Sequence, residues 1–127
     1  PLAAAGAVAD GVGMSAVMSL GAEAVQLGTR FIASVEAEAS EAVRKLILAA
    51  IDTSTESAEG RVRSRVAKKD FAMEVLGKEQ RVQMGQVSAL IDEIKPVEAI
   101  MRELIEGSVA NARKVAEDLA AFEVAKV

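Results

Sequence analysis

The sequence contains neither cysteine nor histidine. Without cysteine, the chain forms no disulfides and no thiolate metal sites. Without histidine, it has no imidazole that acts as an acid, a base or a metal ligand. We therefore expect no metal site, and any proton transfer by these 127 residues must use other side chains.

Aromatic residues and positive charge are also scarce. Three phenylalanines are the only aromatic residues, which leaves no stacking platform for single-stranded nucleic acid. A net charge of −4 without a basic tail argues against a phosphate-backbone partner. The longest uncharged run, Gly11 to Ala22, is shorter than the roughly 20 residues that span a bilayer. We expect a cytoplasmic protein without nucleic-acid or membrane partners.

The residues that are present predict a folded domain. Hydrophobic residues make up 51% of the chain and charged residues 27%, which is typical of globular proteins. The chain begins inside an apolar stretch without an initiating Met, and a two-stranded parallel sheet cannot cover its own faces. We therefore expect these residues to be the C-terminal portion of a larger enzyme.

The first 31 residues predict a strand, a helix and a second strand. Pro1 to Ala5 is an apolar run typical of a strand that is buried on both faces. Asp10 is placed as the N-cap of a helix that stops at Gly21. Its apolar stripe is Met14, Val17 and Met18. Ala24 to Leu27 is the second strand, closed by Gly28-Thr29, so the pattern is a parallel βαβ unit.

Both predicted strands end in turns of small residues at the same edge of the sheet. Such turns let main-chain N–H groups approach an anion, and two on adjacent strands would hold one phosphate from both sides. The alternative is that Gly6 and Gly28 merely permit tight turns.

Two motifs in this stretch resemble the last strand-and-turn segments of the flavin-dependent nitronate monooxygenases, formerly called 2-nitropropane dioxygenases. The flavin-dependent enoyl-acyl-carrier-protein reductases share them. The first motif is matched by Ala4, Ala5, Gly6, Val8, Ala9, Asp10 and Gly11. The second is matched by Gly21, Ala22, Glu23, Val25, Gln26, Gly28, Thr29, Arg30 and Phe31. The chain departs from the family at Ala7, where the family has a second glycine.

The resemblance implies an α/β fold, the C-terminal part of a TIM (β/α)8 barrel that binds flavin mononucleotide (FMN). Residues 1–51 would form the last two β/α units, residues 52–95 a loop-rich segment over the barrel mouth, and residues 96–127 a C-terminal helix. The implied phosphate-binding residues are Ala5, Gly6, Ala7, Gln26, Gly28 and Thr29, with the Thr29 hydroxyl as an added donor. The family's catalytic histidine would lie before this sequence.

The middle of the chain predicts a connector at Arg30 to Ser34 and then a helix. The stripe of this helix, an outer barrel helix, is Val43, Leu46, Ile47, Ala50 and Ile51. Asp52 to Gly60 is polar and is predicted to be a solvated loop, with cation binding as the alternative. Arg61 to Val66 predicts a short edge strand with Val62 and Val66 inward. Its arginines either are solvated or contact a phosphate-bearing substrate.

Two further segments precede the last helix. Lys68 to Leu76 predicts a helix that ends at Gly77 and buries Phe71 and Val75. Val82 to Ile94 resembles the family's C-terminal Gly-Gln segment, in which Gln86 would face the substrate.

Pro96 opens a long helix whose stripe begins with Val97, Ile100, Met101, Leu104 and Ile105 and continues weakly to Phe122. That stripe packs on the barrel or, alternatively, forms a homodimer seam. Gly107 is expected to weaken, kink or break the helix.

Three functions follow as hypotheses. The first is an FMN-dependent oxidoreductase that oxidises alkyl nitronates with O2. The second is an FMN-dependent enoyl-acyl-carrier-protein reductase that uses NAD(P)H. The third is a helical interaction module without a cofactor. In both enzymes the partner is a small-molecule substrate.

Overall fold

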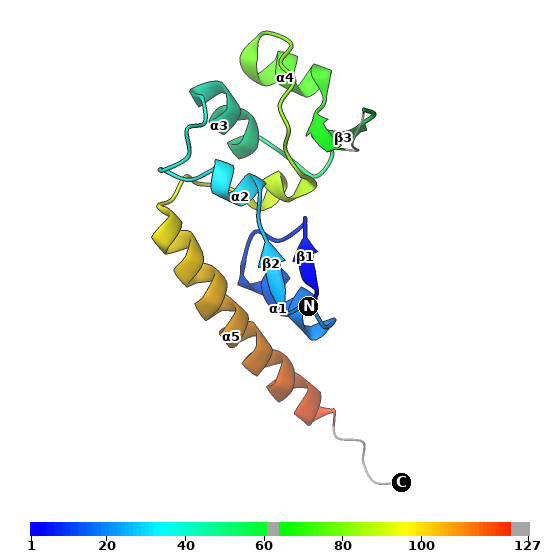
Figure 1. The fold of residues 1–127 in the computed structure, drawn as a ribbon, viewed down its shortest axis with the longest axis vertical. Helices are drawn as coiled ribbons and strands as arrows, with labels where there is room; N and C mark the ends of the chain where they lie inside the picture. The colour runs from blue at the N-terminus through cyan, green and yellow to red at the C-terminus, as the bar shows by residue number, and fades with distance from the viewer. Residues whose placement is uncertain (61–63, 123–127) are drawn as a thin grey trace.

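The computed structural model describes residues 1–60 and 64–122 of the chain, which form a mixed α/β structure. Figure 1 shows a small parallel sheet in the middle, a long helix running past it, and a group of helices and a hairpin at one end. The prediction over Arg61 and Val62 lies outside the described residues.

The predicted βαβ unit is confirmed. β1 (Ala3–Ala5) and β2 (Ala24–Gln26) pair in parallel, with Ala4 opposite Val25. α1 (Gly11–Ser19) joins them, and the carboxylate of Asp10 caps it by accepting a hydrogen bond from the N–H of Gly13 at 2.8 Å. Parallel pairing places the two strand ends at one edge of the sheet, as the sequence predicts.

The burial of β1 differs from the prediction. Ala3 and Ala5 are exposed and Ala4 is half-buried. The reason is that β2 is the only strand paired with β1 in the described part of the chain, and helix α1 covers only one face of the pair. An apolar strand with an open face is one that further chain is expected to cover.

The segment after β2 is helical, so the prediction of a connector at Arg30 to Ser34 is wrong. α2 (Thr29–Ile32) begins directly after Gly28, because main-chain hydrogen bonds close a helical turn there: the N–H of Ile32 donates to the Gly28 carbonyl at 3.1 Å. α3 (Glu41–Leu48) follows with Ser40 as its N-cap. Leu46 and Ile47 of its predicted stripe are fully buried, whereas Ile51 lies past the helix end and is exposed.

The predicted loop over Asp52 to Gly60 is wrong in its second half. β3 (Thr55–Ala58) pairs antiparallel with β4 (Ser64–Ala67). The segment at Val82 to Met84 continues this sheet on the other side of β4: the N–H of Ala67 donates to the carbonyl of Val82 at 2.9 Å. Polar residues occupy β3, so its strand pattern is invisible in the sequence.

The next helix has nearly the predicted bounds, but its predicted buried residues are only half-buried. α4 (Lys69–Leu76) ends at Gly77, whose φ of 68° is left-handed. Its buried residue is Ala72, and Phe71 and Val75 pack around it half-buried. The 3-10 helix η1 (Gln86–Leu90) lies against α2 and α3. The division of the chain at residues 51 and 95 stays a prediction.

The long helix α5 (Val97–Ala121) starts after Pro96 as predicted and runs through Gly107 without a break. Gly107 instead touches Gly11 where α5 crosses α1, and a Cβ on Gly11 would lie 2.4 Å from the Gly107 carbonyl carbon. Ile100 and Leu104 are buried against Val8. Beyond the crossing the stripe is exposed, with Leu119 at 64% and Phe122 at 77%.

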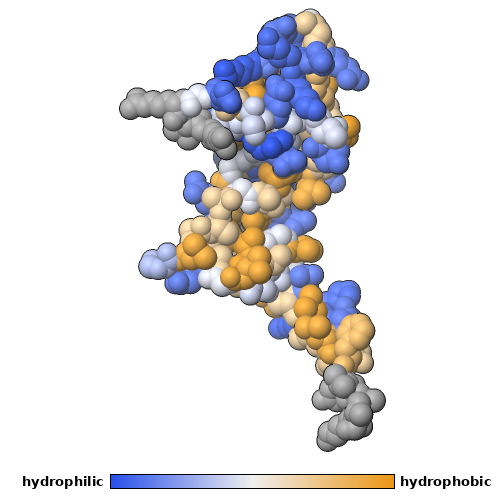
Figure 2. Space-filling model, turned by 90° about the vertical axis from the view of Figure 1, so that its right-hand side faces the viewer, coloured by the Kyte–Doolittle hydropathy of each residue, from blue (hydrophilic) through white to orange (hydrophobic). Residues whose placement is uncertain are grey.

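The surface divides into two regions along the long axis. Figure 2 shows hydrophilic side chains around one end and hydrophobic side chains in the middle and on α5. Within residues 1–60 and 64–122, no helix has the length and apolarity needed to span a bilayer.

Candidate functional site

A hollow of about 240 Å³ lies where β1 and β2 end. Its walls are Ala5, Gly6, Ala7, Val8, Gln26, Gly28, Thr29, Gly85 and Val87. Two walls of the hollow come from the residues at the end of β1 and at the end of β2. The parallel register explains why they meet, because Ala5 lies opposite Gln26 and both segments then leave the sheet. The third wall comes from the start of η1, far along the sequence.

The residues that line this hollow at the two strand ends carry main-chain N–H donors. Gly6 and Ala7 both have positive φ, at 83° and 58°, so the chain turns sharply after β1. Gly28 and Thr29 open α2, where the first N–H groups of a helix have no intrahelical acceptor. No acceptor among the described residues takes a hydrogen bond from the N–H of Gly28 or of Thr29.

Thr29 joins the second wall to the third. Its side-chain oxygen accepts a hydrogen bond from the N–H of Gly85 at 2.9 Å, and the residue is only 8% exposed. A hydroxyl that accepts one hydrogen bond still has its own hydrogen to donate. Thr29 therefore positions Gly85 and keeps one donor, which refines its predicted role as a simple phosphate donor.

The hollow suits an anion and has room for one. In a chain with a net charge of −4, no carboxylate is among its lining residues. A Cβ added at Gly6 or at Gly28 would meet no atom within 4 Å, so open space lies beside both turns. The donor set of N–H groups and one hydroxyl matches the oxygens of a phosphate ester. These residues therefore fit the phosphate of the FMN that the resemblance implies.

All six predicted cofactor-binding residues line this one hollow: Ala5, Gly6, Ala7, Gln26, Gly28 and Thr29. Gln86, the predicted substrate-side residue, is exposed on η1 and is not among the lining residues, although its neighbours Gly85 and Val87 are. Sequence reasoning missed these two. Gly85 was recognisable as part of a family motif, but no pattern in the sequence indicated that it meets Thr29.

Arg30, which the second motif includes, has a structural role. It is 5% exposed, and its Nη1 donates to the carbonyl of Glu93 at 3.1 Å. This hydrogen bond ties α2 to the chain that leads into α5. The arginine thus stabilises the wall behind Thr29 without reaching the lining of the hollow.

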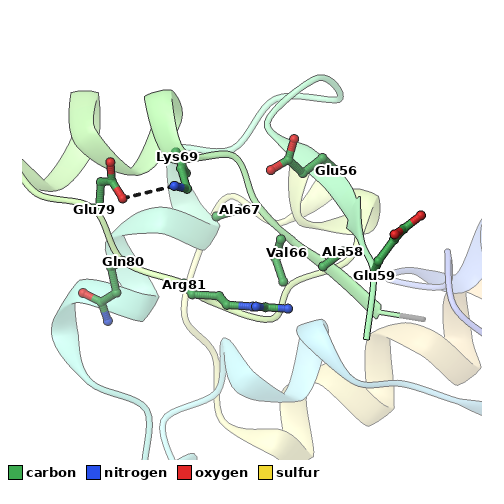
Figure 3. A pocket seen from close by; sticks show the side chains of 9 residues that line it. All are labelled: Glu56, Ala58, Glu59, Val66, Ala67, Lys69, Glu79, Gln80 and Arg81. Carbon is green, nitrogen blue, oxygen red and sulfur yellow. Dashed lines mark ion pairs between the residues drawn. The ribbon is translucent and has the colours of Figure 1, made fainter. Parts of the chain in front are cut away.

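The two hollows with the largest volumes lie elsewhere and have different lining residues. One, of about 360 Å³, lies beside the hairpin and α4 (Figure 3). Figure 3 shows Glu56 and Glu59 on the hairpin side, and an ion pair of 3.5 Å between Lys69 and Glu79. The other, about 450 Å³, is a wide hollow beside α3 that includes Glu38. Carboxylates line both, so neither favours a phosphate.

Comparison with known proteins agrees with the motifs. The family model described as nitronate monooxygenase matches residues 1–103. A nitronate monooxygenase of Paraburkholderia phytofirmans is 46% identical over 48 residues, which cover 38% of this chain and 13% of that protein. A probable nitronate monooxygenase of Staphylococcus aureus is 46% identical over 55 residues, covering 43% of this chain and 16% of that protein.

Solved structures show the same relationship in three dimensions. FabK from Thermotoga maritima superposes with a TM-score of 0.81 at 34% identity, over 92% of this chain and 47% of that chain. Nitroalkane oxidase from Streptomyces ansochromogenes superposes with a TM-score of 0.77 at 18% identity, over 91% of this chain and 41% of that one. At that identity the second match shows the fold alone.

The chain thus spans less than half the length of these two structures. The family match nevertheless covers most of the 127 residues and includes every residue that lines the hollow at the strand ends. This chain belongs to the nitronate monooxygenase family.

Proposed function

We propose that these residues are the phosphate-binding part of an FMN-dependent oxidoreductase. The observation that carries the proposal is the hollow at the ends of β1 and β2, which residues of both strand ends line and which has no carboxylate among its lining residues. The family membership supports the same cofactor. It also favours an enzyme over the helical interaction module.

Each lining residue has a part in holding the cofactor. The N–H groups around Gly6-Ala7 and Gly28-Thr29 bind the phosphate oxygens from two sides, and the Thr29 hydroxyl supplies a further hydrogen. Ala5 and Gln26 end the two strands and fix the spacing of the turns. Gln86, an amide that both donates and accepts, is proposed to face the substrate.

The reaction that we propose is oxidation of an alkyl nitronate with O2. When bound, FMN would supply the redox chemistry between the nitronate and O2. The residues described here bind and orient that cofactor at the end of a barrel whose other strands come from a longer chain. The proposed partners are a small-molecule substrate and a second copy of the protein, with which it forms a homodimer.

A second candidate is an FMN-dependent enoyl-acyl-carrier-protein reductase that uses NAD(P)H. The superposition on FabK at 34% identity favours it, because that match covers nearly the whole chain. Turnover separates the two: rapid flavin reduction by NADH or NADPH with crotonyl-thioester reduction, and no nitronate oxidation, would select the reductase.

The proposed phosphate site is tested by comparing FMN with riboflavin, which lacks the phosphate. The intact protein should bind FMN at least tenfold more tightly than riboflavin, because charge-assisted hydrogen bonds to a phosphate contribute about 1.5–3 kcal/mol. Gly28→Leu should abolish this preference, since its side chain enters the open space beside the turn and its φ of −113° tolerates any residue. Gly28→Ala is the matched control and should lose less of the preference for FMN, because its side chain is smaller.

Fluorescence titration of the flavins measures both affinities. Equal affinity for FMN and riboflavin would contradict the proposed role of the hollow. Failure of the intact protein to bind either flavin would contradict the proposed function as a whole.

A further inference from the structure

A second hollow adjoins the proposed phosphate site. Its volume is about 270 Å³, and its lining residues are Gly28, Thr29, Ile32, Ser64, Arg65, Gln83, Met84 and Gly85. Gly28, Thr29 and Gly85 line both hollows, so the two are contiguous. No carboxylate lines the second hollow, and Arg65 is its one charged lining residue.

The guanidinium of Arg65 is fixed by Thr55 of the neighbouring strand. Its Nε donates to Thr55 Oγ1 at 3.1 Å, and its Nη2 donates to the Thr55 carbonyl at 3.0 Å. Thr55 itself is 4% exposed, so this anchor is rigid. An arginine that is already ordered loses less side-chain entropy when it binds a ligand.

The backbone of Arg65 is also tied to the first hollow. The N–H of Met84 donates to the Arg65 carbonyl at 3.2 Å, and the N–H of the next residue, Gly85, donates to Thr29 Oγ1 at 2.9 Å. Two consecutive residues thus connect the strand that carries Arg65 to the wall of the proposed phosphate site. The position of Arg65 relative to a bound cofactor is therefore set by hydrogen bonds.

This cation is held without being neutralised. Within residues 1–60 and 64–122, no carboxylate forms an ion pair with Arg65, and Nη1 has no hydrogen-bond acceptor. By contrast, Lys69 and Arg102 each pair with a glutamate. A half-buried guanidinium with open donors favours an anionic ligand with planar or tetrahedral oxygens.

We propose that Arg65 binds a phosphate group of the second ligand, the molecule that meets the flavin. The inference rests on the proposed FMN site and on the second candidate function, because NAD(P)H carries phosphate and an alkyl nitronate does not. It goes beyond both by assigning a recognition residue to a hollow next to the cofactor site. Of the arginines in the predicted basic strand, Arg61 and Arg63 lie outside the described residues, and Arg65 lines this hollow.

The probes are ADP and adenosine, which differ by the anionic group alone, titrated by calorimetry into the intact protein saturated with FMN. Saturation keeps the first hollow filled. Arg65→Met should weaken ADP binding about tenfold or more and leave adenosine unaffected, because a charge-assisted hydrogen bond is lost. Arg65→Lys should show a smaller loss, since the charge remains without the paired donors.

Arg102→Met is the matched control, because it removes an equal charge from the exposed face of α5, where Arg102 pairs with Glu98. It should bind ADP like the wild type. Inorganic pyrophosphate identifies the source of the recognised group: the same dependence on Arg65 supports recognition of phosphate from any carrier, and binding of ADP alone supports a nucleotide.

Folding is separated from binding by Thr55→Val, which removes the hydroxyl that accepts from Nε and Nη2 of Arg65 but keeps the carbonyl contact and the charge, so the guanidinium is held less firmly and ADP binding should weaken severalfold. If ADP bound equally well to Arg65→Met and Arg102→Met, or not at all to the wild type, the proposal would be overturned. If Arg65→Met did not fold, unchanged ADP affinity in both Thr55→Val and Arg65→Lys would overturn it. Absence of FMN binding would defeat the proposed function, and the Arg65–Arg102 comparison on the flavin-free protein would still decide this inference.

Discussion

Ala7 is the one non-glycine residue with positive φ among the described residues. A side chain in the left-handed region costs roughly 1–2 kcal/mol because Cβ crowds the following carbonyl. This strain explains why the resembled family has glycine at this position. Alanine keeps the main-chain N–H at this position but adds a methyl group to a left-handed backbone.

We therefore expect Ala7→Gly to raise the free energy of unfolding by about 1 kcal/mol, because relief of the strain exceeds the added entropy of the unfolded chain. Urea denaturation of the intact protein measures it. Ala9→Gly is the control and should lower the same quantity, since Ala9 is buried and has an ordinary φ. A less stable Ala7→Gly variant would show that the turn is not strained.

Thr29→Val should lower stability by about 1 kcal/mol or more, because the buried acceptor of the Gly85 N–H disappears. The variant should also bind FMN several-fold more weakly, since the hydroxyl donor is lost. Thr29→Ser keeps the oxygen and should retain most of both properties. Parallel measurements of unfolding and of FMN affinity check this. A valine variant with wild-type values in both would remove Thr29 from the site.

At the scale of elements, the crossing of α1 and α5 is the tightest helix contact described. A Cβ on Gly11 would lie within 2.6 Å of three backbone atoms of Gly107 and Ser108, whereas a Cβ on Gly107 would lie 3.3 Å from the Gly11 Cα. Asn111 Nδ2 also donates to Ser15 Oγ at 3.1 Å across the two helices. The two glycines therefore have unequal tolerance for a methyl group.

Gly11→Ala should destabilise the protein by about 2 kcal/mol or more, because backbone atoms cannot move aside for a methyl group as side chains do. Gly107→Ala should change stability by less than about 1 kcal/mol, since a small clash is offset by the better helix propensity of alanine. Thermal unfolding monitored by circular dichroism measures both. Equal effects of the two substitutions would contradict the described crossing.

Lys95 fixes the start of α5. Its ammonium group contacts Glu103 at 2.7 Å and Glu93 at 2.7 Å. These two hydrogen bonds, of which the one to Glu103 has the larger effect, raise the pKa of Lys95 above its ordinary value of 10.5. A raised folded-state pKa gives stability that is fully present below the unfolded pKa and is lost as pH rises through the folded one.

The difference in stability between wild type and Lys95→Met should therefore be constant from neutral pH to just below 10.5 and should shrink above it. Chemical denaturation over that pH range checks the expectation. A difference that already disappears near neutral pH would mean that another group controls this contact.

Sequence patterns predicted the elements whose signals are local. Asp10 as a cap, Gly77 as a helix end and Pro96 before a helix all follow from single-residue chemistry. β3 escaped prediction because Thr55 to Ala58 has no apolar alternation, and its strand exists only through pairing with β4. Likewise, the two small-residue turns at the strand ends were predictable, but the part of the hollow formed by Gly85 depends on a contact across 56 residues of sequence.

At the scale of the whole molecule, the proposed cofactor should stabilise the fold. FMN at about 100 times its dissociation constant should add roughly 2.7 kcal/mol to the free energy of unfolding of the intact protein. Removal of FMN by dialysis should reverse this increase in the free energy of unfolding. Riboflavin should produce a smaller increase than FMN. Differential scanning calorimetry measures the series. An FMN effect no larger than that of riboflavin would exclude a contribution from the phosphate hollow.

Exposed hydrophobic side chains show which surfaces further chain would cover. The alanines of β1 and the distal stripe of α5 both stand open in the described residues. Their position agrees with a chain that spans less than half of the FabK structure. We propose that the remaining strands of a barrel cover the sheet. We also propose that a second copy of the protein covers the distal part of α5.

The contact between Gly11 and Gly107 has a mechanical consequence. Gly11 directly follows the Asp10 cap, and the turn at Gly6-Ala7 lies a few residues before Asp10. The contact between the two helices is therefore close in sequence to that turn. A displacement of α5 along its axis is transmitted through bare backbone, with no flexible side chain to absorb it. We therefore expect a shift of α5 to move the turn at Gly6-Ala7 through this contact.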